Sequence, residues 1–315
     1  MEQKRILWPA VVAGAILLGF LGFFFRGRIF TPQKIFFSET KKLKIVTTFF
    51  PIYDFAREVG KDKIDLEILF SQTPEVVSFS PTEIQKIHKA DIIIKNGAGL
   101  EPVLDELIAA SDHPNIIKID TSEGIVTFSP VEQIELTESG GKNKHGNIDP
   151  HIWLDPNNAV VQVENIRDAF ALHDSANADF YRRNAEKYIR ELRALDQEIQ
   201  ETLNKLHKKD FISFHSAFQY FAKRYGLNQA ATIEEFPGKE PSPRYLSEVI
   251  KLIRKLEISS IFSEPQFSPK VVEVIAHDLN LKVYALDPIE TGDPTKDSYI
   301  SIQRKNLGIL QEALQ

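Results

Sequence analysis

Two histidines in unusual surroundings are the residues of this chain best suited to chemistry. His151 lies between two prolines in the run DPHIWLDP (149–156), and His215 lies farther along in the run SFHS (213–216). Proline fixes φ and biases the residue before it toward extended geometry, so the first run is typical of a rigid turn that presents one imidazole. Because neutral imidazole is a common metal ligand, the two histidines would form half of a transition-metal site if folding brought them together. The alternative is a packed turn whose histidine only hydrogen-bonds to backbone.

The composition narrows the class of protein around these histidines. A chain of 315 residues is expected to form about two domains, and its 43% hydrophobic content is enough for sizeable cores. The net charge of −6 and the lack of a long basic run argue against nucleic acid as a partner. Since the chain has no cysteine, disulfides, thiolate metal sites and cysteine nucleophiles are excluded.

The N-terminus predicts attachment to a membrane. Residues 6–25 carry no charge, follow Lys4 and Arg5, and precede Arg26 and Arg28. A helix of this length spans ~30 Å, about one hydrocarbon core, whereas the apolar region of a cleaved signal peptide is shorter, ~7–15 residues, and ends at a small-residue cleavage site. We therefore predict an uncleaved signal anchor with the rest of the chain outside the cytoplasmic membrane. A buried core helix is the weaker alternative.

Beyond residue 42, short apolar runs alternate with helical patterns. The predicted strands are residues 43–50, 64–70, 91–95, 116–119, 211–214, 230–233, 259–262 and 282–286. The predicted helices are residues 51–59, 81–89, 101–110, 176–206, 215–225, 242–256, 268–279 and 297–314. Such alternation predicts an α/β fold with parallel sheets covered by helices. His215 and Asp287 each directly follow a predicted strand, and ligands of such sheets bind beyond the carboxyl ends of the strands.

The helix at 176–206 is the longest of these elements. Its apolar residues recur at spacings of three, four and seven among charged neighbours, which predicts one buried stripe on a helix ~46 Å long. We predict that it joins two α/β lobes as a rigid strut, and a coiled-coil dimerisation helix is the alternative. The predicted divisions are a signal anchor (1–29), a linker (30–42), an N-terminal lobe (43–174), the connecting helix (175–208) and a C-terminal lobe (209–315).

Several segments together resemble one known family, the metal-binding solute receptors of zinc and manganese ABC importers (ZnuA/TroA-like). The segments that carry the resemblance are IVTTFFPIY (45–53), NGAGLEP (96–102), DPHIWLDP (149–156), FHSAFQYFA (214–222), EPSP (240–243), EPQFSP (264–269) and LDP (286–288). The resemblance implies two α/β lobes bridged by one helix, with the metal in the cleft between them. It also implies that the chain is a binder and not an enzyme, capturing a divalent cation in the periplasm or at the cell surface for an ABC permease, as a monomer.

The resemblance carries the metal ligands of the family onto His151, His215 and Asp287. A fourth ligand of the family, a histidine in the first lobe, falls on Val77, which has no lone pair to donate. Since a tetrahedral zinc site needs four ligands, the candidates for the remaining position are Glu75, Glu264 and water.

Zinc is the predicted metal, followed by manganese and iron(II), because nitrogen and oxygen ligands bind zinc more tightly on intrinsic affinity. Two other classes stay open. Three protein ligands and a water also describe a catalytic zinc site, so a metal-dependent hydrolase with Glu75 or Glu264 as base is one alternative. An adhesin built on the same scaffold, with a decayed metal site, is the other.

Overall fold

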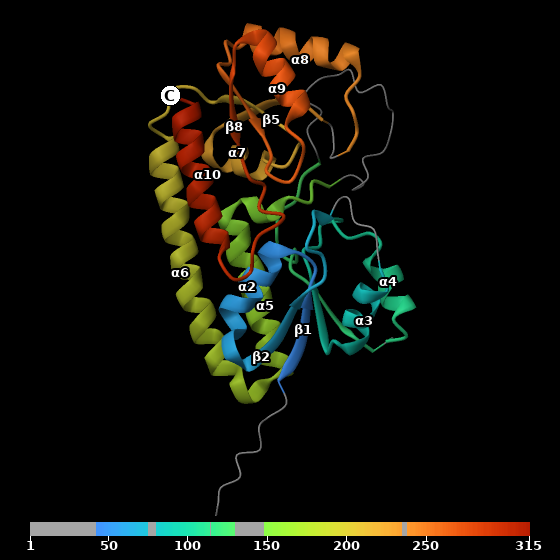
Figure 1. Cartoon of the computed structure of the whole chain (residues 1–315). Coiled ribbons are helices and arrows are strands. Elements are labelled where there is room, and N and C mark those ends of the chain that lie inside the picture. The colour runs from blue at the N-terminus through green and yellow to red at the C-terminus, as the bar shows by residue number, and fades with distance from the viewer. Residues whose placement is uncertain (1–41, 75–79, 114, 130–147, 235–237) are drawn as a thin grey trace, which may run out of the picture. The chain divides into compact units, whose positions relative to one another are not determined.

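Strands and helices alternate along the part of the chain that the computed structural model describes, residues 42–74, 80–113, 115–129, 148–234 and 238–315 (Figure 1). The strands are β1 (Leu43–Thr47), β2 (Ile64–Ile68), β3 (Ile92–Lys95), β4 (Ile117–Asp120), β5 (Asp210–Ser213), β6 (Asn228–Thr232), β7 (Ser260–Ser263) and β8 (Lys282–Ala285). The α-helices are α2 (Phe50–Gly60), α3 (Pro81–Lys89), α4 (Leu104–Ala110), α5 (Pro156–His173), α6 (Ala178–Leu203), α7 (Gln219–Tyr225), α8 (Pro243–Lys255), α9 (Lys270–Leu279) and α10 (Tyr299–Ala313). Short 3₁₀ turns are η1 (Lys61–Lys63), η3 (Ile152–Leu154) and η4 (Ser175–Asn177). The predicted α/β fold with parallel strands is confirmed.

The first four strands form one parallel sheet in the order β2-β1-β3-β4, with helices on both faces (Figure 1). Side chains alternate between the faces, as the pleat of a strand requires. Ile45 and Ile92 pack into the core on the side of α2 and α5, whereas Val46 and Ile93 pack into a second cluster with α3 and α4. Because both faces are covered, the central strand β3 is a run of three isoleucines, whereas the edge strand β2 (IDLEI) alternates apolar and acidic residues.

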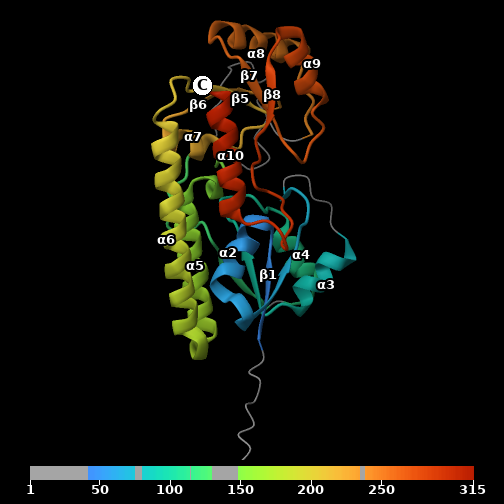
Figure 2. The same ribbon diagram turned by 60° about the vertical axis from the view of Figure 1, so that its left-hand side comes forward.

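The last four strands form two parallel pairs, β5-β6 and β7-β8, and β5 also contacts β7. Helices α8 and α9 cover one face of these strands, and α10 lies on the other side (Figure 2). Ile212 and Ile261 pack into the cluster with α8 and α9, whereas Phe211 and Phe262 belong to the same core as α6 and α10. Both halves of the chain therefore use the same two-faced construction.

Helix α6 contacts α2, α5, α7 and α10, so it packs against helices from both halves. Its 26 residues give it a length of ~39 Å, shorter than the predicted 176–206. Its buried stripe, which includes Tyr188, Leu195 and Leu203, joins a core that reaches from the first sheet to Phe262 on β7. Residues 42–315 accordingly form one compact unit, and the boundaries proposed for two lobes stay a prediction.

Several predicted elements differ from the structure, and three of the differences change how neighbouring elements connect. The stretch before α6 forms a separate helix, α5, and the chain breaks at Asp174, whose Oδ2 accepts hydrogen bonds from Asn177 Nδ2 (2.7 Å) and the Tyr181 hydroxyl (2.6 Å). The strand predicted over 43–50 ends at Thr47, because α2 already begins at Phe50 and has Pro51 in its first turn.

The third difference concerns the segment that carries His215. The sequence predicted a helix over 215–225, but α7 begins only at Gln219. His215 therefore lies in the connection between β5 and α7, where its backbone N–H donates to the side chain of Glu264 instead of to a helical carbonyl.

The predicted membrane anchor, residues 6–25, lies outside the described residues. Within residues 42–315, as far as the structure describes them, no helix is both long and apolar enough to cross a membrane.

Candidate metal site

His151 is presented by a tightly bonded turn just before η3. Asp149 Oδ1 accepts hydrogen bonds from both the backbone N–H of His151 (3.0 Å) and its ring Nδ1 (2.8 Å). Two hydrogen bonds from elsewhere in the chain fix this turn. Asn96 Nδ2 donates to Pro150 O (2.9 Å), and the Tyr220 hydroxyl donates to Asp149 O (2.9 Å). His151 is 4% exposed. The rigid turn expected from the prolines is present, and it fixes the ring through its Nδ1 atom.

His215 is held in the same way by a residue far away in the chain. Glu264, which directly follows β7, accepts a hydrogen bond from the backbone N–H of His215 (3.1 Å). Its two oxygens lie 2.7 and 2.8 Å from the ring Nδ1 of His215. Burial raises the pKa of Glu264, and the facing His215 ring opposes that shift. Because a carboxylate only accepts hydrogen bonds, Nδ1 carries the proton and Nε2 is left as the metal-binding atom.

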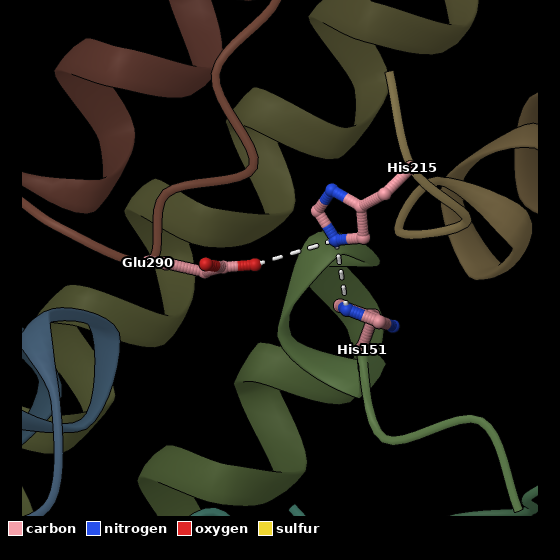
Figure 3. A group of neighbouring side chains, drawn as sticks. All are labelled: His151, His215 and Glu290. Atoms are coloured by element: carbon pink, nitrogen blue, oxygen red, sulfur yellow. Dashed lines mark hydrogen bonds and ion pairs between the residues drawn. The ribbon is translucent and has the colours of Figure 1, made fainter. Parts of the chain in front are cut away.

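The two Nε2 atoms face one another at 3.3 Å, and Glu290 Oε1 lies 3.5 Å from His215 Nε2 (Figure 3). Candidate ligand atoms of His151, His215 and Glu290 all lie within 4.8 Å of one another, and all three side chains are buried. Two ligands of one tetrahedral zinc, bound at ~2.0–2.1 Å, are separated by about 3.3–3.4 Å. The spacing therefore suits a small ion with few ligands.

The orientation of Glu290 comes from a strained turn after β8. Asp287 Oδ1 accepts a hydrogen bond from Ile289 N (2.7 Å), and Ile289 has φ of 60°, an unfavourable value for a β-branched residue. Trp153 Nε1 donates to Pro288 O (2.8 Å), so the turn is also fastened to the segment that carries His151. Burial raises the pKa of Asp287 to about 6. Asp287 thus supports the turn that aims Glu290.

A buried acceptor without a donor marks this place as suited to a cation. Glu290 is 1% exposed, and within the described part of the chain its Oε1 accepts no hydrogen bond. Leaving such an acceptor unsatisfied costs about 1–3 kcal/mol or more when the group is charged. An ion bound by Oε1 and the two Nε2 atoms would give Oε1 a partner.

The structure sorts the predicted site residues into distinct places. It brings His151 and His215 together and sets Glu264 behind His215, against Nδ1 rather than Nε2. It does not bring Asp287 into the group. Glu75 and the position of the missing family histidine, Val77, lie outside the described residues.

Glu290 is the residue that the sequence analysis missed. It lies three positions after Asp287 in the run DPIE (287–290), beyond the carboxyl end of β8. A signal was present, because a second carboxylate follows the same strand end. The sequence alone cannot say which of the two points into the site, since that depends on the turn at Ile289.

Two buried imidazoles and a buried carboxylate, with ligand atoms within 4.8 Å of one another, form a candidate metal-binding site in this α/β protein. Residues 45–313 match the model of the family described as zinc-uptake complex component A, periplasmic (ZnuA). The chain belongs to this family, as the resemblance of its segments predicted.

Two relatives show how far the similarity extends. The zinc-binding lipoprotein AdcA of Streptococcus pneumoniae serotype 4 is 31% identical over 278 residues, which are 86% of this chain and 56% of AdcA. The high-affinity zinc uptake system protein ZnuA of Bacillus subtilis is 30% identical over 284 residues, 88% of this chain and 89% of that protein. The chain thus spans little more than half the length of AdcA but most of the length of ZnuA.

Solved structures agree with the fold. A Zn(II)-bound variant of AdcAII from Streptococcus pneumoniae has a TM-score of 0.78 and 29% identity, covering 87% of this chain and 99% of that one. The laminin-binding protein Lmb of Streptococcus agalactiae, described as a bifunctional protein with adhesin and metal transporting activity, has a TM-score of 0.75 and 27% identity, covering 87% of this chain and 100% of Lmb.

Proposed function

We propose that this chain captures zinc outside the cytoplasmic membrane and delivers it to the permease of an ABC importer. The observation that carries the proposal is the pair of imidazoles whose Nε2 atoms lie 3.3 Å apart while a carboxylate holds each Nδ1 atom. Carboxylate–histidine–metal arrangements of this kind fix the tautomer and the orientation of metal ligands. We assign the three protein ligands to His151, His215 and Glu290.

The identity of the metal follows from the donor atoms and their spacing. Two imidazoles and one carboxylate oxygen favour zinc over manganese and iron(II), which come next. The predicted fourth ligand, Glu75 or water, belongs to this proposal. Glu264 is less suited to that position, because both of its oxygens lie against His215 Nδ1.

The same contact argues against a hydrolase that uses Glu264 as its general base. A general base must reach a water on the metal, but Glu264 faces the opposite side of the His215 ring. The family is one of binding components of zinc uptake and not of enzymes. Adhesin activity is described for Lmb, and we assign it to Lmb alone.

The remaining parts of the proposal concern the whole molecule. We propose that residues 43–174 and 209–315 act as two lobes with the metal between them, joined by the helix at 175–208. The anchor at 6–25 would keep the receptor near its permease and raise its effective concentration there. Because one core runs along α6 past both groups of strands, we expect only a small movement of the lobes on metal release.

Metal binding can be tested directly on the full chain after chelator treatment. We expect Zn²⁺ to raise the unfolding free energy by about 2.7 kcal/mol at a hundredfold excess over Kd, more than Mn²⁺ or Fe²⁺ at the same concentration. His151→Ala, His215→Ala and Glu290→Ala should each abolish the shift, measured by thermal melting and by calorimetric titration.

Two further variants make the test specific. His277 on α9 is exposed, so His277→Ala should respond to zinc as the wild type does. Asp287→Ala should weaken zinc binding less than Glu290→Ala, because Asp287 acts only through its turn. An undiminished zinc response in both His151→Ala and His215→Ala would refute the proposed site.

A further inference from the structure

One hydroxyl group contacts the proposed ligand Glu290 directly. Thr73, which follows β2, donates a hydrogen bond from Oγ1 to Oε2 of Glu290. Both side chains are buried, with 7% of Thr73 and 1% of Glu290 exposed. The contact joins residues 217 positions apart, so it is a feature of the folded site and not of a local turn.

The hydrogen bond makes the two oxygens of Glu290 unequal. Oε2 is occupied by Thr73, whereas Oε1 lies 3.5 Å from His215 Nε2 and accepts no hydrogen bond within the described residues. The terminal torsion of a glutamate is broad and nearly free, so without a partner the carboxylate could rotate to present both oxygens. The Thr73 hydroxyl therefore holds it in a position that presents one.

The number of oxygens presented matters for the choice of metal. Zinc is satisfied by four ligands in a tetrahedron, which needs a single oxygen from Glu290. Manganese favours octahedral, oxygen-rich sites and gains from a carboxylate that binds through both oxygens. A carboxylate held to one oxygen thus favours zinc.

We propose that Thr73 is a specificity-determining residue, which limits Glu290 to one coordinating oxygen and so favours zinc over manganese. The inference rests on the proposed function, because it requires that His151, His215 and Glu290 bind the metal. Thr73 does not bind the metal itself and acts by positioning Glu290.

The test compares two substitutions in the full chain. Thr73→Val keeps the shape of the side chain and removes the hydroxyl, whereas Thr73→Ser keeps the hydroxyl. Affinities for Zn²⁺ and Mn²⁺ would be measured by competition with a chromophoric chelator. We expect Thr73→Val to weaken zinc roughly 10–100-fold, as is common for groups that orient metal ligands. The affinity for manganese should fall less or should rise, so the ratio of zinc affinity to manganese affinity should decrease. Thr73→Ser should keep the wild-type ratio.

A spectroscopic measurement separates positioning from general damage to the fold. Four-coordinate Co²⁺ absorbs visible light much more strongly than Co²⁺ with more ligands, so its spectrum reports coordination number. We expect strong absorption in the wild type and Thr73→Ser, and weak absorption in Thr73→Val. If Thr73→Val does not fold, Thr73→Ala removes the same hydroxyl with less bulk and decides the question.

The possible outcomes distinguish this inference from the proposed function. If the wild type binds neither metal, the proposed function fails. If the wild type binds zinc but the hydroxyl-free variant loses both metals equally, or keeps its ratio and Co²⁺ spectrum, the role of Thr73 is overturned while the proposed function stands.

Discussion

A carboxylate hydrogen-bonded to Nδ1 orients each of the two histidines, but the two carboxylates come from different distances along the chain. Asp149 lies two residues before His151 and forms its contacts within one turn, whereas Glu264 lies 49 residues after His215 and reaches it from another strand. Each carboxylate takes both the backbone N–H and the ring Nδ1 of its histidine. One half of the site is thus local in the sequence and the other half is made only by tertiary folding.

The difference extends to how fully each carboxylate is used. Glu264 places both oxygens against His215 Nδ1, and Gln266 Nε2 also donates to its Oε2 (3.3 Å). Asp149 uses only Oδ1, and its buried Oδ2 accepts no hydrogen bond within the described residues. We infer that the orientation of His215 depends more heavily on its carboxylate than that of His151 does.

The largest effect is expected at Glu264. In Glu264→Gln the remaining oxygen could still accept from both N–H groups of His215, but the amide NH₂ in place of Oε2 would face the N–H of His215 Nδ1 (2.8 Å) and the Nε2 of Gln266 (3.3 Å), which would lose its acceptor. Zinc affinity should fall toward the upper end of a ~10–100-fold range, and the unfolding free energy of the metal-free chain should fall by about 2 kcal/mol. Calorimetric titration and urea unfolding measure the two effects, and Glu273→Gln on the exposed side of α9 should change neither.

A smaller effect is expected at Asp149. Asp149→Asn keeps one oxygen acceptor, and the turn remains fastened through Pro150 O and through the Tyr220 hydroxyl. Zinc affinity should fall by only about tenfold in the same titration. The exposed Asp278→Asn is the matched control. If Asp149→Asn lowered zinc affinity as much as Glu264→Gln does, the inferred difference between the local contact at His151 and the long-range contact at His215 would be wrong.

The smallest effect on zinc affinity is expected at Glu101, which supports the turn of His151 only through Asn96. Glu101 accepts hydrogen bonds from Asn96 N (2.7 Å) and Thr48 Oγ1 (2.8 Å), and burial raises its pKa from 4.5 to about 7 against these contacts. Between these values the folded chain keeps a proton that the unfolded chain has released. The protonated carboxyl group of Glu101 therefore makes its full contribution to the unfolding free energy below about pH 4.5, and this contribution is lost as the pH rises through about 7.

Glu101→Gln should remove this pH dependence. The unfolding free energy of the wild type minus that of the variant should fall as the pH rises from about 5 to 7.5, by at most ~1.4 kcal/mol per pH unit. Urea unfolding across this range measures the slope, with the exposed Glu106→Gln as control. A difference that is flat or that rises with pH would contradict the direction of the shift.

Local signals predicted most of the elements well. The helix expected over 81–89 is α3 to the residue, because Ser80 and Glu83 form a capping box and Pro81 occupies the first turn. The separate helix α5 was missed because the stretch 157–225 contains neither glycine nor proline, and the break before α6 depends on side-chain hydrogen bonds to Asp174. Breaks without a proline or glycine leave little trace in a sequence.

The sequence by itself determined the alternation of strands and helices, the turn that presents His151 and the family to which the chain belongs. These depend on neighbours within a few residues or on the order of short segments. Only the tertiary structure decided that Glu264 would hold His215 and that Glu290, rather than Asp287, would point at the two imidazoles. Those contacts join strand ends from distant parts of the chain, and their geometry follows from how the sheets pack and from a strained turn at Ile289.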